Sequence, residues 1–291
     1  MLESFLKLNV PDDGWRIIAV DNASTDKTKE ILLKYSNQLP IQYVYEEKKG
    51  KNNALNEAIK HIDSDDLIVF TDDDIIPSRD WLVKLLSCAN KNIDYTIFGG
   101  NIVPYWPRVP EAWILELVPL GVTYALTRSN TLEGDIFPGL IWGPNMAVRR
   151  SVFDEGYRFN GDIGPNGENY VMGSETDFTI RLHKDGYKSW FCKEASVQHI
   201  IRERQMEADW IIARAFRFGR NMYRQESTSY GSNVAFFMGI PRWMFNKQLR
   251  QYLRLVISKF TRDKRESFSS KWEISFFKGY FTESRMESKK S

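Results

Sequence analysis

The sequence contains little cysteine. Its only two cysteines, Cys88 and Cys192, are too few and too far apart along the chain to indicate a disulfide framework or a paired-cysteine metal site. We therefore expect free thiols in a reducing compartment. A cytoplasmic location, at most at the cytoplasmic face of a membrane, follows from this expectation.

Long hydrophobic runs are also missing. No segment approaches the roughly 18 apolar residues that a membrane-spanning helix requires. The first residues, MLESFLKLNVPDDGW, lack the basic start and apolar stretch of a signal peptide. The sequence therefore predicts a soluble or membrane-peripheral protein.

The chain has almost no net charge, since 40 Lys and Arg are balanced by 38 Asp and Glu to give +2. This balance predicts no nucleic-acid partner. Beyond Ile200, however, basic residues recur among aromatic and aliphatic ones, as in PRWMFNKQLRQYLRLVISKF and around Trp210, Ile211, Phe216 and Phe218. Such segments suit an anionic membrane surface, and the alternative is that they pack on the catalytic domain.

Short apolar runs alternate with helical periodicity from Trp15 to about residue 100. The strands predicted from these runs are RIIAV, IQYVYE, LIVFT and YTIFGG, with helices over 27–38, 54–62 and 81–86 between them. Repeated β-α-β units predict an α/β fold with a mostly parallel, Rossmann-like sheet and flanking helices.

The alternation is lost between about Pro104 and Gly139, which we interpret as connecting structure. WGPNMAVRRSVF and KSWFCKEASVQHI then predict strands, with a helix over about 175–184 between them. Mainly helical structure is expected after His199, with a frayed end after Thr282. The predicted division is a catalytic domain at 1–203 and a helical C-terminal extension at 204–291 that contacts a membrane peripherally.

Three consecutive acids, Asp72, Asp73 and Asp74, follow an apolar run in VFTDDDIIP. In open α/β sheets, ligands bind beyond the carboxyl ends of the strands, where these acids are expected. Adjacent carboxylates repel one another unless a cation neutralises them, and hard oxygen ligands favour Mg²⁺ or Mn²⁺. The alternative is a solvated acidic turn.

Several motifs occur together in a fixed order: AVDNASTDKT, EKKGKNNALNEAI, TDDDIIPSRDWL, GSETDFTIRLHKDGYKSWF and SVQHI. In this order the chain resembles the inverting family 2 glycosyltransferases of GT-A fold over about residues 15–201. The resemblance implies a nucleoside-diphosphate sugar donor, expected to be a UDP-sugar. It implies a saccharide or lipid-linked acceptor, and Mn²⁺ or Mg²⁺ as cofactor.

By this resemblance, Asp21 and Asn22 fall where the family contacts the base and ribose, while Lys49 and Lys51 fall where it meets the nucleotide or its diphosphate. Asp72 joins this donor-binding set. Without the resemblance, the first pair would be an Asx-type turn after a strand and the lysines a solvated loop.

The resemblance places the metal at the acidic motif, with Asp73 and Asp74 as the preferred ligands and His199, at the end of a predicted strand, as a third. A literal DxD interpretation selects Asp72 and Asp74 instead. A strand-end histidine can also be purely structural.

GSETDF matches the family's ED-type motif, with Ser174 in place of the usual Glu and Glu175 in place of the usual Asp. The general-base role therefore transfers to Glu175. The alternative is an S-x-x-D helix start formed by Ser174 and Asp177.

Trp142, Gly143 and Asn145 match the segment that lines the acceptor pocket in the family, and Asp177 is placed with them. An aromatic side chain there can stack on a sugar face, although Trp142 could equally be a core residue.

The implied reaction is a single displacement at the anomeric carbon, with Glu175 taking the acceptor proton. One alternative is a sugar nucleotidylyltransferase, but the Gly-rich, Arg-containing phosphate loop that it requires after the first strand is missing. Another is a non-catalytic, degenerate transferase domain that serves as a binding partner. That alternative arises because family members usually have an extra strand and helix ahead of the segment at Trp15, so the first strand is expected to be missing.

Overall fold

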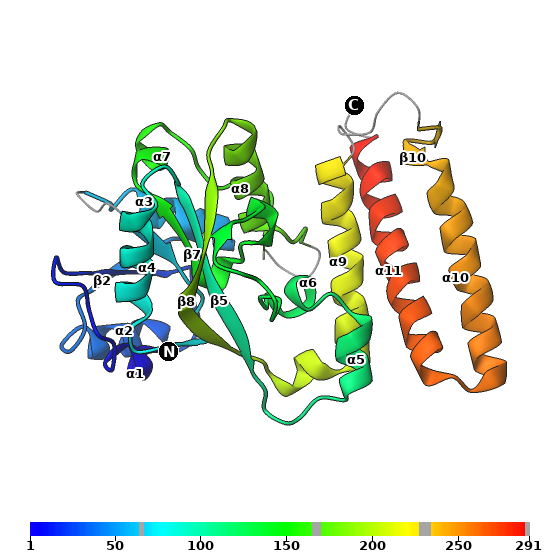
Figure 1. The fold of residues 1–291 in the computed structure, drawn as a ribbon, viewed down its shortest axis with the longest axis horizontal. Helices are drawn as coiled ribbons and strands as arrows, with labels where there is room; N and C mark the ends of the chain where they lie inside the picture. Colours follow the sequence, from blue (N-terminus) through cyan, green and yellow to red (C-terminus); the bar gives the residue numbers. More distant parts are fainter. Residues whose placement is uncertain (64–66, 165–169, 227–233, 289–291) are drawn as a thin grey trace. The chain divides into compact units, whose positions relative to one another are not determined.

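The computed structural model describes residues 1–63, 67–164, 170–226 and 234–288. It divides into two compact units (Figure 1). Unit 1 contains residues 1–105, 124–170 and 174–200, and unit 2 contains residues 106–123, 171–173 and 201–291. Unit 2 thus takes a segment from the middle of the chain as well as the C-terminal helices. The domain boundary at residue 203 stays a prediction.

Unit 1 begins with the β-α-β unit that the sequence predicts. Strands β1 (Ile17–Asp21) and β2 (Ile41–Tyr45) pair in parallel as a two-stranded sheet. Helix α2 (Thr28–Tyr35) connects them, α3 (Lys51–Ile59) follows β2, and a short α1 (Leu2–Phe5) precedes β1. Both strands end on the same side, so Asp21 and Tyr45 are paired neighbours.

The second sheet of unit 1 has the strand order β3-β7-β5-β8-β4, with β6 paired to β8 outside this path. Figure 1 shows β5, β7 and β8 side by side. The bounds are β3 (Leu67–Phe70), β4 (Ile75–Pro77), β5 (Ile97–Tyr105), β6 (Gly134–Asp135), β7 (Met146–Arg149) and β8 (Ser189–Ile200).

The α/β fold class with flanking helices is confirmed, but the expected predominance of parallel pairing is corrected. Among the described strands of this sheet only β5 and β8 pair in parallel, whereas β7 runs antiparallel to both β3 and β5. The reason is that β7 follows the long connection after β5 and not a β-α-β crossover, and only a crossover forces a strand to run parallel to its predecessor. The predicted alternation of strands and helices holds as far as β3, because β4 follows β3 without a helix and pairs antiparallel with β8.

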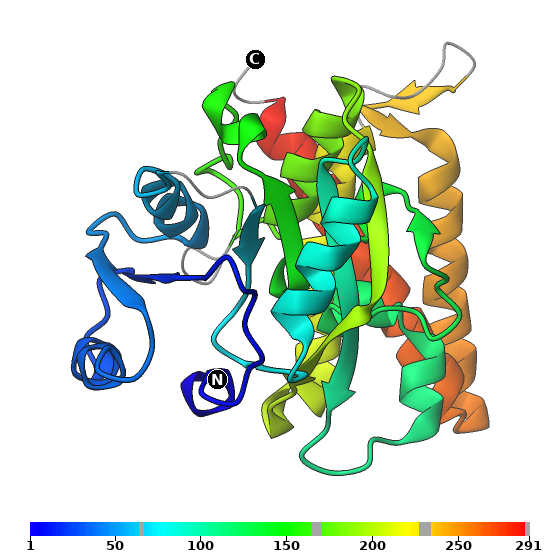
Figure 2. The ribbon, with the colours of Figure 1, turned by 60° about the vertical axis from the view of Figure 1, so that its left-hand side comes forward.

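Helix α4 packs on this sheet and is drawn in cyan in Figure 2, and the 3₁₀ turn η2 also contacts its strands. Helix α8 contributes Phe178 and Leu182 to a core cluster that also contains Phe70 of β3 and Met146 of β7. The remaining elements of unit 1 are α4 (Trp81–Lys91), α7 (Ser151–Asp154), α8 (Ser174–Lys184), η1 (Pro138–Leu140) and η2 (Gly143–Asn145).

A disulfide joins Cys88 of α4 to Cys192 of β8, with their Cα atoms 6.1 Å apart. This corrects the expectation of two separate thiols. The expectation relied on their separation of 104 residues along the chain, but α4 packs directly against β8. Distance along the sequence is therefore a poor guide to pairing in a β-α-β fold.

Unit 2 contains the predicted C-terminal helices. Helix α11 packs against both α9 and α10, and α5 also contacts α11. No helix in the described part of the chain combines the length and apolarity needed to cross a membrane. The bounds are α5 (Ala112–Leu117), α6 (Leu120–Tyr124), η3 (Glu203–Met206), α9 (Ala208–Glu226), β9 (Phe236–Phe237), β10 (Ile240–Pro241), α10 (Arg242–Thr261) and α11 (Lys264–Glu287).

Helices α9 and α11 approach closely because each presents a glycine to the other. A Cβ atom on Gly219 would lie 1.9 Å from the carbonyl oxygen of Phe276, and one on Gly279 would lie 1.9 Å from that of Phe216. The expected fraying after Thr282 is corrected, since α11 is helical to Glu287.

The end of α11 is fixed by a buried charge cluster. Glu283 is only 1% exposed and accepts 2.6 Å hydrogen bonds from Arg220 and Arg224 of α9. A buried carboxylate is tolerated when it is paired and hydrogen-bonded in this way. These ion pairs hold the last turns of α11 against α9. Apolar periodicity does not predict a helix there, because this part of the sequence is too polar.

Candidate active site

The three predicted acids follow β3, but the structure sends them to different partners. Thr71 donates a 2.9 Å hydrogen bond to the carbonyl of Pro144, which fixes the start of the acidic turn against η2. Asp72 then lies against Lys51, Asp74 faces His199, and Asp73 is exposed. The turn is thus anchored and is not a simple solvated loop.

Lys51, the first residue of α3, bridges two carboxylates from distant parts of unit 1. Its Nζ lies 2.7 Å from Asp72 Oδ1 and 2.6 Å from Glu175 Oε1. Burial alone would lower the pKa of Lys51, but the two carboxylates outweigh it and raise that pKa. Burial is also the main cause that raises the pKa of Asp72, and the nearby charge of Glu175 adds to it. One ammonium group therefore holds two negative charges together.

Glu175 lies in the first turn of α8 and packs against a residue without a side chain. Its carboxylate fills the space where a Cβ atom of Gly143 would be, at 2.1 Å from Glu175 Oε1. The Glu175 side chain is only 17% exposed, so the carboxylate is largely shielded from water. A shielded carboxylate with a fixed position is suited to proton abstraction.

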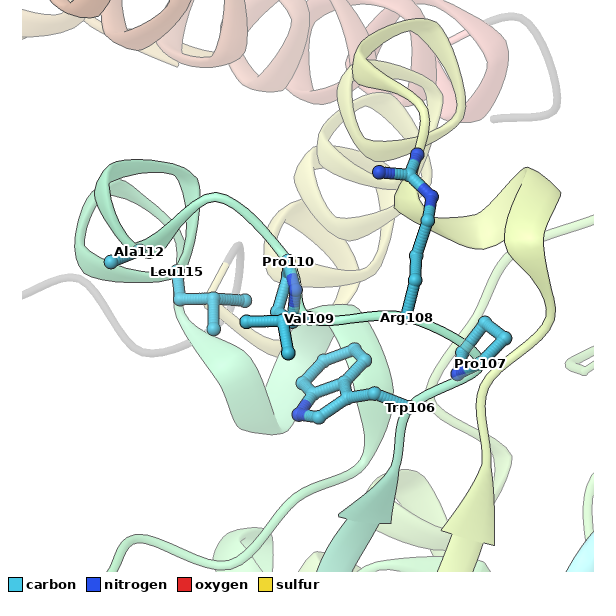
Figure 3. A pocket seen from close by; sticks show the side chains of 7 residues that line it. All are labelled: Trp106, Pro107, Arg108, Val109, Pro110, Ala112 and Leu115. Carbon is cyan, nitrogen blue, oxygen red and sulfur yellow. The ribbon is translucent and has the colours of Figure 1, made fainter.

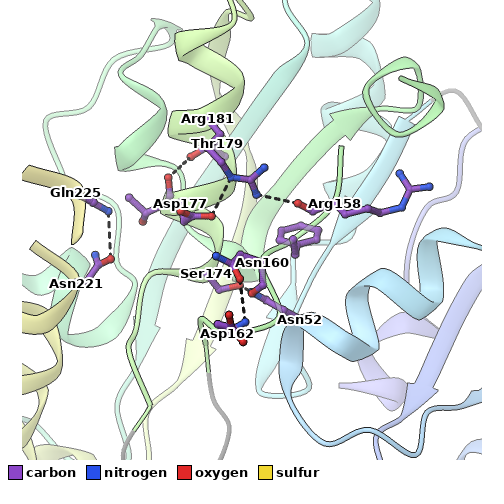
Figure 4. Close-up of polar contacts among 12 residues, drawn as sticks. Asn52, Arg158, Asn160, Asp162, Ser174, Asp177, Thr179, Arg181, Asn221 and Gln225 are labelled. Carbon is purple, nitrogen blue, oxygen red and sulfur yellow. Dashed lines mark hydrogen bonds and ion pairs between the residues drawn. The ribbon is translucent and has the colours of Figure 1, made fainter. Parts of the chain in front are cut away.

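Ser174 begins α8, and its hydroxyl contacts another helix. Its hydroxyl donates to Asn52 Oδ1 on α3 and so joins α8 to α3. Asp177 pairs with Arg181 one turn later, at 3.1 Å. Arg181 also donates to the carbonyl of Arg158, so this pair holds the neighbouring loop (Figure 4).

Two asparagines of α3 position this part of unit 1, and sequence reasoning missed both. Asn52 donates a 2.6 Å hydrogen bond to the carbonyl of Asn160 (Figure 4). Asn56 makes two hydrogen bonds to the backbone of Phe159, as donor at 2.8 Å and as acceptor at 2.9 Å. The available signal was the spacing of two asparagines one helical turn apart, because asparagine is a poor helix former in the absence of tertiary contacts.

His199 and Asp74 form a second polar pair, at the antiparallel pairing of β4 with β8. His199 Nδ1 lies 2.7 Å from the carbonyl of Tyr124, and its Nε2 lies 3.5 Å from Asp74 Oδ1. Burial lowers the His199 pKa, but the hydrogen bond and charge of Asp74 outweigh it, so that pKa is raised. Because Nδ1 can only donate to a carbonyl, Nε2 is the nitrogen directed at the acid.

The family resemblance implies a divalent cation, and the donor atoms can be compared with that requirement. No group of three or more His, Cys, Asp or Glu side chains among the described residues could hold a metal by itself. Asp74 can supply an oxygen donor and His199 a nitrogen donor, and these two atoms lie 3.5 Å apart. Mg²⁺-type sites commonly use one or two protein ligands and complete their shell with substrate phosphates and water. The pair therefore fits a cation that is shared with a diphosphate.

The predicted nucleotide residues lie at the ends of β1 and β2. Asp21 is 4% exposed and accepts hydrogen bonds from the Ser24 amide and the Tyr43 hydroxyl. Burial opposes ionisation of Asp21, but these hydrogen bonds outweigh it and lower its pKa. Asn22 donates to the carbonyls of residues 46 and 48, and Lys49 is exposed.

Asn22 also accepts a 2.7 Å hydrogen bond from the amide of Gly50. Gly50 has φ 128°, a conformation that favours glycine, and it directly precedes α3. Asn22 thus fixes the loop that delivers Lys51 to the two carboxylates.

The residues predicted to line the acceptor pocket differ in their burial and in what they contact. Trp142 is half-buried, and Gly143 lies under Glu175. Asn145 is fully buried, where its amide donates to the carbonyls of Asn101 and Ala195 and accepts from the Trp81 indole. These contacts make Asn145 a support of β5 and β8.

A pocket lies entirely within unit 2 and is formed by the segment after β5 together with α5 (Figure 3). It contains none of the predicted site residues and no acidic side chain in its lining. It therefore lacks the ligands of a metal-diphosphate site. Its lining is Trp106, Pro107, Arg108, Val109, Pro110, Ala112 and Leu115.

Comparison with known proteins gives a family match. The sequence model described as Glycosyl transferase family 2 matches residues 1–156. A glucosyl-dolichyl phosphate glucuronosyltransferase of Haloferax volcanii is 26% identical over 159 residues, covering 52% of this chain and 48% of the relative. The succinoglycan biosynthesis protein ExoM of Rhizobium meliloti is 26% identical over 222 residues, covering 75% and 68%. The chain thus spans between about half and two thirds of the length of these relatives.

A solved structure supports the fold. The mannosyltransferase PcManGT from Pyrobaculum calidifontis, in complex with GDP-Man and Mn²⁺, aligns with a TM-score of 0.60 at 14% identity. The alignment covers 97% of this chain and 81% of that one. At this identity the likeness shows a shared GT-A fold and nothing finer.

Proposed function

Because the chain belongs to glycosyl transferase family 2, we propose that it transfers a sugar from a nucleoside-diphosphate sugar to an acceptor hydroxyl with inversion. The proposed acceptor is a saccharide or a lipid-linked saccharide in polysaccharide or glycolipid synthesis. Relatives named for glucuronosyl transfer and succinoglycan biosynthesis support this class of product. A sugar nucleotidylyltransferase is not the family that the chain matches.

One observation carries the proposal: Lys51 lies within 2.7 Å of both Asp72 and Glu175. The bridge places the candidate general base beside the acidic turn at which a diphosphate would bind. A donor diphosphate brings oxygens that compete for the Lys51 ammonium. Movement of Lys51 toward them would release the Glu175 carboxylate.

Glu175 is the proposed general base. In the reaction the acceptor hydroxyl oxygen forms a bond to the anomeric carbon while the bond from that carbon to the diphosphate oxygen breaks. The acceptor proton passes to Glu175, and the nucleoside diphosphate leaves on the opposite face of the sugar. Gly143 leaves the space in which the Glu175 carboxylate lies.

Asp74 and His199 are proposed to hold Mn²⁺ or Mg²⁺, with Asp73 beside them. When bound, the cation would supply charge stabilisation to the departing diphosphate. The His199 Nδ1 contact with Tyr124 fixes the ring so that Nε2 faces the proposed site. Asp21, Asn22 and Lys49 are proposed to form the nucleotide end of the donor site, with a UDP-sugar as the expected donor.

Calorimetry tests the donor site directly. UDP and GDP titrated into the protein should bind in Mn²⁺ and lose most of their affinity in EDTA. The variant Asp74→Ala with His199→Ala should bind equally weakly under both conditions. Asp154→Ala, at an exposed residue of α7, is the control and should behave as the unaltered protein does.

Equal affinity for the nucleotide in Mn²⁺ and EDTA would refute the shared-cation proposal. Absence of any nucleotide binding would instead favour a non-catalytic, degenerate domain. The site is further proposed to operate at a membrane surface, where a lipid-linked acceptor would be located. The expected cytoplasmic location loses its basis, because Cys88 and Cys192 form a disulfide.

A further inference from the structure

Helix α10 packs on the rest of unit 2 through an unusual seam. The α10 residues buried most deeply are Met244, Gln251 and Ser258, which recur every seven residues. Two of these three are polar, and Ser270 of α11 lies within 3.4 Å of Gln251 as a hydrogen-bond donor. A surface helix of a globular protein normally turns its apolar residues inward. Here the inward seam is largely polar.

The outer face of α10 is correspondingly apolar. Its large apolar side chains are between 40% (Tyr252) and 85% (Phe260) exposed. At the α-helical repeat they fall within roughly 140° of the circumference, so they form one continuous stripe. The stripe comprises Leu249, Tyr252, Leu253, Val256, Ile257 and Phe260.

Helix α9 behaves differently, which corrects part of the sequence-based expectation. Ile211 is fully buried, and Phe218 packs against the rings of Trp272 and Phe276 on α11. The aromatic residues of α9 are thus largely used in packing within unit 2. Of these two helices, it is α10 that leaves a broad apolar stripe exposed.

Charge indicates what covers this stripe. Helix α10 carries five basic residues and no Asp or Glu over Arg242–Thr261. Arg250 and Lys259 fall on opposite flanks of the stripe at the α-helical repeat. An apolar stripe flanked by cations is the pattern of a helix that lies in the plane of an anionic bilayer surface. A second copy of this helix is disfavoured, because pairing would bring like charges together.

We propose that the outer face of α10 docks on an anionic lipid surface, with its apolar stripe at the boundary between headgroups and acyl chains. The inference deepens the proposed function by naming the surface that would bring the enzyme to a lipid-linked acceptor. It rests on that function only for the identity of the acceptor.

Co-sedimentation with vesicles tests the proposal on the full chain. Vesicles of phosphatidylcholine containing phosphatidylglycerol should bind the protein at low salt, and pure phosphatidylcholine vesicles should bind it less. Leu253→Glu with Ile257→Glu should lower the partition coefficient at least about tenfold. Arg250→Glu with Lys259→Glu should remove the preference for the anionic lipid.

The matched control is Ile93→Glu with Leu132→Glu, which places the same charges at two residues of unit 1 that are each 76% exposed. This variant should bind vesicles as the unaltered protein does. Equal vesicle binding by the stripe variant, or no preference of the unaltered protein for anionic vesicles, would overturn the proposal. So would a dimer in solution that the stripe variant dissociates, because the stripe would then be a subunit interface.

Nucleotide binding measured on the same samples separates this inference from the proposed function. Loss of lipid binding with unchanged nucleotide binding supports the docking surface. Intact nucleotide binding without any lipid binding would refute the docking surface and leave the transferase proposal in place.

Discussion

Glu175 is the residue whose substitution most directly tests the chemistry. Glu175→Gln keeps the side-chain shape and removes the basic carboxylate, so turnover should fall by about 10² to 10⁴. Metal-dependent nucleotide binding should survive, because Asp74 and His199 are unchanged. Single-turnover kinetics and calorimetry measure the two effects separately. Near-normal turnover would move the base elsewhere, and loss of both would show that the variant disturbs the site through Lys51.

Gly143 offers a test of the same base that alters no charge. Gly143→Ala would put a Cβ atom 2.1 Å from Glu175 Oε1, so the carboxylate must move. We expect turnover to fall at least about tenfold while nucleotide affinity stays within about twofold, because the geometry of a general base decides its efficiency. Gly161→Ala is the control, since its nearest contact is a looser 3.1 Å to the Asn53 side chain. Unchanged turnover in Gly143→Ala would argue against Glu175 as the base.

At the scale of elements, the α9–α11 contact depends on backbone proximity. Gly219→Ala should gain about 1 kcal/mol of helix propensity. It would also force a Cβ atom to 1.9 Å from the Phe276 carbonyl oxygen. Overpacking of this kind costs about 1 to 3 kcal/mol. Because the contact is with backbone, we expect the larger value and a net loss of stability in thermal or denaturant unfolding.

Lys271→Ala, on the exposed side of α11, is the control for Gly219→Ala. It should change the free energy of unfolding by no more than about 0.5 kcal/mol. A stabilised Gly219→Ala variant would mean that helix propensity outweighs the contact and that the two helices separate easily.

The elements most accessible to prediction are those with local signals. Strands β1, β2, β3 and β5 follow from short apolar runs, and α8 from its periodicity, because each signal lies within the element itself. The antiparallel entry of β7 was not predictable, since it depends on how a long connection returns to the sheet. That α10 packs through its more polar face was not predictable either. Periodicity shows that a helix has an apolar face and a polar face, but it does not show which of them packs.

The same distinction applies to the candidate site. The acids that follow a predicted strand led to Asp72 and Asp74 as candidates, whereas Glu175 became a candidate only through the family resemblance, and their roles stay predictions. That Lys51 would bridge Asp72 and Glu175 could not be read from the sequence, because the bridge joins residues 124 positions apart. The support from Asn52 was missed for the same reason.

At the scale of the whole molecule, the Cys88–Cys192 disulfide gives a prediction for unit 1. It closes a loop over a sequence separation of 104 residues. Restricting the unfolded chain over a long loop typically stabilises a protein by about 2 to 4 kcal/mol. Cys88→Ser with Cys192→Ser should therefore lower the free energy of unfolding by about that amount. The unaltered protein should match this variant in the presence of a reductant.

Mass spectrometry after thiol alkylation is the companion measurement. The unaltered protein should take up no alkylating group before reduction and two groups after it, matching its two cysteines. Two alkylated thiols in the unreduced protein would show that the pair is open in solution, and the stability difference should then vanish.

The bridge at Lys51 also has a consequence for the order in which the molecule acquires structure. Its contact with Glu175 spans 124 residues, and the contact of Asn52 with Ser174 spans 122. Contacts between distant residues form slowly, because the entropy of closing the loop is lost before the contact compensates for it. A chain emerging from the ribosome can complete the β1-α2-β2 unit while α8 is still unsynthesised. Competence for catalysis should therefore be acquired late in folding and be the first property lost when α8 detaches, well before the sheet melts.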